Sequence, residues 1–108
     1  MGNKCCVLTI RQEFNIEFDQ ELSLLNTLRY NKSRYFYIIE TINVYQIILQ
    51  KLDNPYNDYG NNRVGFTNIV YDVFDEMYNM TIKSKMTFVE KDMILKRLNK
   101  IPIQETLD

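Results

Sequence analysis

The stretch from Ser33 to Leu52 carries the longest regular apolar pattern in the chain and constrains its fold most. Its apolar residues recur every three or four positions, which is the spacing of one face of an α-helix; they are Tyr35, Ile38, Ile42, Tyr45, Leu49 and Leu52. Five more widen that face: Phe36, Ile39, Val44, Ile47 and Ile48. Because Ser33 is a favourable N-cap, we predict a central, deeply buried helix over residues 34–52.

Residues 5–18 show a different pattern, in which apolar and polar residues alternate. The apolar positions share one parity, as expected for a strand with one buried face; they are Leu8, Ile10, Phe14, Ile16 and Phe18. We therefore predict an N-terminal β-strand, or a hairpin bent near residues 11–13. A strand needs a partner, which is either residues 101–104 or the same strand of a second copy, giving a homodimer.

Three further helices follow from capping residues and periodicity. Asp19 is a suitable N-cap for a helix over residues 20–30. Apolar spacing predicts a helix over 66–82, and Thr87 with Glu90 forms a capping box for one over 88–99. With the strand, these helices predict an α+β fold, mainly α, in a single domain spanning residues 1–108.

Residues 53–65 hold most of the helix-breaking residues and predict a loop. Two tyrosines in this polar loop offer contact area for another protein, so the predicted partner-binding residues are Tyr56, Asn57, Asp58 and Tyr59. A calcium loop does not fit, because aligning Gly60 with the EF-hand glycine puts Phe66 where the bidentate Glu belongs.

The charge balance argues against a strongly electrostatic nucleic-acid binder. The 13 Lys and Arg against 14 Asp and Glu leave a formal charge of -1, whereas such binders carry a basic excess. A small basic patch with neighbouring tyrosines, formed by Arg29, Lys32 and Arg34, leaves weak nucleic-acid binding as an alternative.

The chain has few of the residues and motifs that catalysis usually requires. The chain has no His, which is the usual general base, and its 3 Gly form no phosphate-binding loop. Asp72, Asp75 and Glu76 lie on the predicted helix over 66–82, where we interpret them as a solvated face. We therefore expect no enzyme activity, no cofactor and no metal site.

Residues 1–6 bear on the cellular compartment of the protein. Cys5 and Cys6 are adjacent and cannot form an ordinary disulfide, which favours a reducing cytoplasm. Gly2 together with Cys5 and Cys6 resembles the start of some doubly acylated proteins. An alternative function is therefore a lipid-anchored adaptor on the cytoplasmic face of a membrane.

By exclusion, the sequence predicts a small non-enzymatic protein-binding or regulatory module, of unidentified partner. Its many Tyr, Phe and Met, against 3 Gly and 2 Pro, indicate a source with an AT-rich genome. A viral or phage inhibitor, or an immunity-type protein, fits these properties. The acylated adaptor and the weak nucleic-acid binder remain the alternatives.

Overall fold

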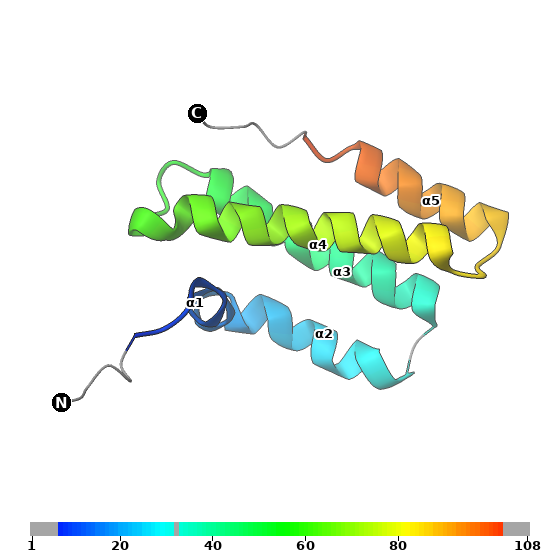
Figure 1. Cartoon of the computed structure of the whole chain (residues 1–108), viewed down its shortest axis with the longest axis horizontal. Coiled ribbons are helices and arrows are strands. Elements are labelled where there is room, and N and C mark those ends of the chain that lie inside the picture. The colour runs from blue at the N-terminus through cyan, green and yellow to red at the C-terminus, as the bar shows by residue number, and fades with distance from the viewer. Residues whose placement is uncertain (1–6, 32, 103–108) are drawn as a thin grey trace.

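The computed structural model describes residues 7–31 and 33–102, and all its regular elements there are helices. Two long antiparallel helices, α3 and α4, form the centre (Figure 1). The elements in chain order are α1 (Ile10–Glu17), α2 (Asp19–Asn31), α3 (Arg34–Asp53), the 3-10 turn η2 (Gly60–Asn62), α4 (Arg63–Lys83) and α5 (Phe88–Asn99).

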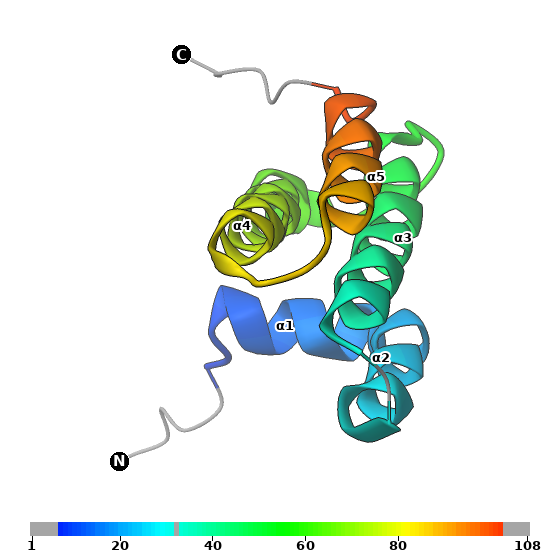
Figure 2. The same ribbon diagram turned by 90° about the vertical axis from the view of Figure 1, so that its right-hand side faces the viewer.

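The other helices lie on two sides of the α3–α4 pair. Seen end-on in Figure 2, α5 rests on one side and touches both central helices. On the opposite side α1 runs across the pair, while α2 lies along α3. This arrangement covers α3 on both sides, whereas α4 meets α1 over only part of its length.

One cluster of buried side chains joins these helices. Most of it comes from the facing sides of α3 and α4, which makes α3 the most buried helix, as predicted. The buried apolar residues are Phe14, Phe18, Ile38, Ile42, Val44, Tyr45, Ile48, Leu49, Leu52, Phe66, Ile69, Val70, Val73, Phe74, Met77 and Ile94.

The predicted N-terminal strand is wrong, and with it the α+β class. Residues 10–17 form α1, and no strand occurs in residues 7–31 or 33–102. Thr9 caps α1: its hydroxyl accepts from the Gln12 N–H at 3.1 Å, and the Gln12 side chain accepts from the Thr9 N–H at 2.8 Å. This capping box begins a helix inside the segment that alternation assigned to a strand.

The alternating pattern led to a wrong prediction because the spacing of the same apolar residues also fits a helix. Ile10, Phe14 and Phe18 lie four residues apart, which places them on one helix face. Phe14 is 0% exposed, whereas Ile16, which a strand would bury equally, is 65% exposed. The predicted pairing with residues 101–104, or with a second copy in a homodimer, therefore has no strand to form it.

The remaining four helices lie where capping and periodicity predicted them, with small shifts at their ends. The Ser33 hydroxyl caps α3 by accepting from the Phe36 N–H. The Thr87–Glu90 capping box is present at the start of α5. Asp19 is the exception, since it lies in the first turn of α2 rather than preceding it.

A sharp corner at Phe18 joins α1 to α2 without Gly or Pro. The Phe18 ring is buried, with its centroid 5.0 Å from that of Phe14 and 5.8 Å from that of Phe66. Aromatic pairs at these separations add to the free energy of burial. The burial of Phe18 in an aromatic cluster therefore stabilises the corner. The cluster consists of Phe14, Phe18, Tyr45, Tyr59 and Phe66.

Candidate functional site

The main candidate site is a groove bounded by α1, α2, α3 and α4, here called the α2–α4 groove. It has a volume of about 680 Å³. The residues that line it are Arg11, Asn15, Asp19, Leu22, Ser23, Leu25, Asn26, Tyr37, Thr41, Tyr45, Asp72, Val73, Glu76 and Met77. None of these residues was a predicted binding residue.

The groove exists because α1 covers only the first part of one α4 face. Gly65 marks the covered part, since a Cβ there would lie 3.0 Å from Cγ1 of Ile10. Steps of seven, four and seven residues from Gly65 lead to Asp72, Glu76 and Lys83, which continue the same helix face. Beyond α1 this face borders open space instead of another helix.

A second concavity of about 790 Å³ adjoins the groove along α4 and shares Asp72 and Glu76 with it. Three cationic side chains also line this second concavity: Arg34, Lys83 and Lys85. Acidic and basic side chains therefore occupy separate parts of this α4 face. Acidic residues occupy the middle, Arg11 stands at one end, and the three cations stand at the other.

Tyr45 brings a buried polar group to the wall of the α2–α4 groove. The residue is 8% exposed and its ring stacks on Phe14, with centroids 6.1 Å apart. Burial raises the pKa of its phenol above the usual value, while the Arg11 guanidinium acts in the opposite direction. The phenol is therefore protonated at neutral pH and available to a ligand in the groove.

The predicted partner-binding loop divides into an outward and an inward part. Tyr56 is 93% exposed. Tyr59 instead packs on Phe18 and Phe66, with centroids at 5.8 and 6.2 Å, and the guanidinium carbon of Arg63 lies 5.1 Å from its ring centroid. The structure therefore places one predicted tyrosine on the surface and uses the other to close the aromatic cluster.

The other two predicted loop residues hold the loop itself. The Asn57 side chain donates to the carbonyl of Lys51 at 3.0 Å, and the Asp58 carboxylate accepts from the Gly60 N–H at 2.8 Å. Gly60 has a φ of 56°, which suits a residue without a Cβ. Asn57 and Asp58 thus make local contacts that shape the turn.

We expect substitutions of the two loop tyrosines to differ clearly in their effect on stability. Tyr56→Ala should change the free energy of unfolding by less than about 0.5 kcal/mol, as is usual for exposed sites. Tyr59→Ala should lower it by about 1–3 kcal/mol, since it removes a ring from the aromatic cluster. Urea denaturation followed by circular dichroism measures both, and equal effects would contradict this account of the loop.

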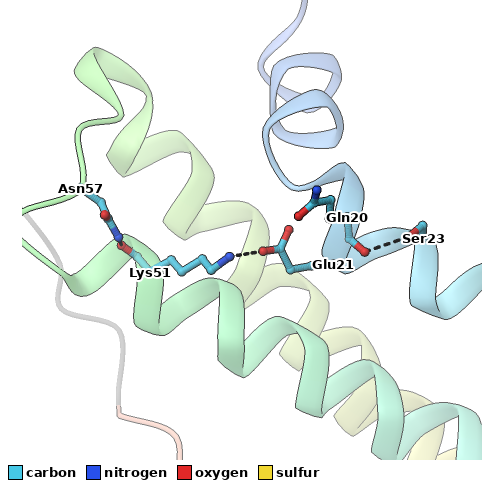
Figure 3. Close-up of polar contacts among 5 residues, drawn as sticks. All are labelled: Gln20, Glu21, Ser23, Lys51 and Asn57. Atoms are coloured by element: carbon cyan, nitrogen blue, oxygen red, sulfur yellow. Dashed lines mark hydrogen bonds and ion pairs between the residues drawn. The ribbon is translucent and has the colours of Figure 1, made fainter.

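An ion pair holds α2 against α3 near this loop (Figure 3). The Lys51 ammonium donates to the Glu21 carboxylate. Burial alone would raise the pKa of Glu21, but the hydrogen bond from Lys51 holds it below its usual value. The same bond raises the pKa of Lys51. Both groups are therefore charged at neutral pH, and the pair belongs to the scaffold of the site.

Of the residues predicted for the two alternative functions, the structure describes the side chain of Arg34 alone. Arg34 lines the second concavity beside Asp72 and Asp75, whose charges repel phosphate. The side chains of Arg29 and Lys32, its predicted companions, lie outside what the structure describes. The predicted acylation residues, Gly2, Cys5 and Cys6, also lie outside the described residues.

Among the side chains that the structure describes, no group of three His, Cys, Asp or Glu is placed to hold a metal ion. None of the described helices combines the length and the apolar character needed to cross a bilayer.

Comparisons of the chain with protein-family models, curated proteins and solved structures gave no match.

Proposed function

We propose that this chain is a small non-enzymatic protein-binding module that regulates its partner, as an inhibitor or immunity-type protein does. The partner docks in the α2–α4 groove. One observation carries this proposal: the α4 face that α1 covers at Gly65 continues past α1 without a covering helix. A second protein that packs there completes the helical layer.

The composition of the groove supports a protein ligand. Protein interfaces combine an apolar centre with a polar, hydrated rim and are enriched in tyrosine. The groove offers both kinds of surface: Leu22 and Leu25 are half-buried apolar side chains, and Tyr37 and Tyr45 add two aromatic ones among mainly polar neighbours. Charged residues such as Asp72 and Glu76 stand exposed at its edge.

Site-specific photo-crosslinking in the source cell tests this function. A benzophenone amino acid replaces Ser23 or Asn79, which line the two concavities and are exposed. Matched probes replace Ile47 or Gln50, which are exposed on α3. Ile47 lies two positions after Tyr45 and so points about 200° away from it around the helix.

We expect the Ser23 and Asn79 probes to crosslink to the same protein and the two α3 probes to leave it unlabelled. A partner labelled mainly from Ile47 or Gln50 would contradict docking in the groove. So would the absence of any crosslink from Ser23 and Asn79 in cells that make the folded protein.

A further inference from the structure

We infer that the segment received by the α2–α4 groove is an amphipathic helix of the partner with Lys or Arg near its middle. This inference rests on the proposed function, because it names the chemistry of the partner at that same groove. Three observations carry it: the shape of the uncovered α4 face, the distribution of charge along it, and the Tyr45 hydroxyl, which no described residue hydrogen-bonds.

The uncovered face has the form and length that a short helix fits. From Asp72 to Lys83 it extends for about 16 Å at the rise of an α-helix. Its residues recur at three and four positions, so their side chains form the ridges and grooves on which another helix packs. A partner helix of about three turns matches this length and places its apolar side on Leu22 and Leu25.

The charges specify the polar side of that helix. Asp72 and Glu76 border both concavities, and neither forms an ion pair with any other residue that the structure describes. Cations stand only towards the ends of the face, at Arg11 and around Lys83. A helix with basic residues at its middle, and none at its ends, is therefore complementary to the whole face.

Tyr45 supplies an independent indication of a ligand. No residue in the described part of the chain forms a hydrogen bond with its hydroxyl. No fully buried polar side-chain atom there lacks a partner, so this hydroxyl must reach the open space of the groove that Tyr45 lines. Its oxygen can accept a hydrogen bond from the N–H of a Lys or Arg side chain.

Other occupants fit less well. A two-fold contact between copies brings the same surface patch of each together. When its axis passes through the acidic middle of the face, Asp72 and Glu76 oppose the same acids of the second copy. Like charges facing each other across an interface are strongly unfavourable. Nucleic acid meets the same obstacle, because its phosphates would face these carboxylates.

A displayed peptide library tests the inference directly. The library presents helical peptides of about four turns with leucines on one face and all amino acids allowed at two central and two terminal positions of the other. It is selected on the full-length protein. The double variant Asp72→Lys/Glu76→Lys serves for comparison, and Glu17→Lys/Asp53→Lys, which alters two exposed acids that line neither concavity, is the matched control for net charge.

We expect Lys and Arg to be enriched at the central positions and not at the ends. Selected peptides should bind the Asp72→Lys/Glu76→Lys variant at least about tenfold more weakly, a change of about 1.4 kcal/mol, and the control variant with unchanged affinity. Central positions without a basic preference, or equal weakening by both variants, would overturn the inference. Crosslinking from Ser23 and Asn79 would be unaffected by that result, so the two proposals fail separately.

Discussion

Phe14→Ala is expected to lower the free energy of unfolding by about 3–5 kcal/mol, the range for removal of a buried Phe side chain. Phe14 is 0% exposed, and its ring lies 5.5 Å from that of Phe66 on α4 and 6.1 Å from that of Tyr45 on α3, measured between centroids. The substitution thus removes the contact that holds α1 across the central pair. Urea denaturation followed by circular dichroism measures the loss.

Ile16→Ala is the matched control, because Ile16 lies two positions away and is exposed. In α1 the substitution should change the free energy of unfolding by less than about 0.5 kcal/mol. In a strand with one buried face, Ile16 and Phe14 would be buried together, and both substitutions would destabilise strongly. Similar losses at the two positions would therefore contradict the helix.

Ile94→Ala is expected to release α5 from the rest of the protein. Ile94 is the one fully buried residue of α5, a helix that the structure describes in full. The substitution of a buried Ile by Ala costs about 2–5 kcal/mol. Because so much of the anchoring of α5 depends on this residue, we expect the loss to appear first as local opening of residues 88–99.

Hydrogen exchange resolved by residue measures this opening. In the Ile94→Ala variant the amides of α5 should exchange at least about tenfold faster, while those of α3 keep most of their protection. Val89→Ala, at an exposed position of the same helix, should leave both unchanged. Equal loss of protection in α3 and α5 would show that α5 unfolds only together with the centre.

Residues 5–18 were predicted to form a strand, whereas residues 10–17 form α1, and the difference shows where sequence patterns become ambiguous. An apolar residue every second position includes one every fourth position, so Ile10, Phe14 and Phe18 satisfied both periods. The Thr9–Gln12 capping box was present in the sequence and favoured the helix. No residue pattern marked the corner at Phe18, because a turn without Gly or Pro forms only when burial of its side chains in the core stabilises it.

The candidate site was less predictable than the fold. The predicted residues Tyr56 to Tyr59 are adjacent in the sequence, whereas the groove joins Arg11, Tyr45 and Asp72 from three helices. On the sequence alone, Asp72 and Glu76 had the properties of a solvated helix face. Gly65, seven positions before Asp72 on the same face, was the single hint that another helix crosses there.

Local patterns in the chain determined the positions of α2, α3, α4 and α5, because capping residues and the three-to-four spacing of apolar side chains act within a few turns of helix. Tertiary packing decided the rest: that residues 10–17 coil into a helix, that Tyr59 turns inward, and that α4 keeps one uncovered face. Each of these depends on which surfaces meet across the core, and burial against a distant partner cannot be read from neighbouring residues.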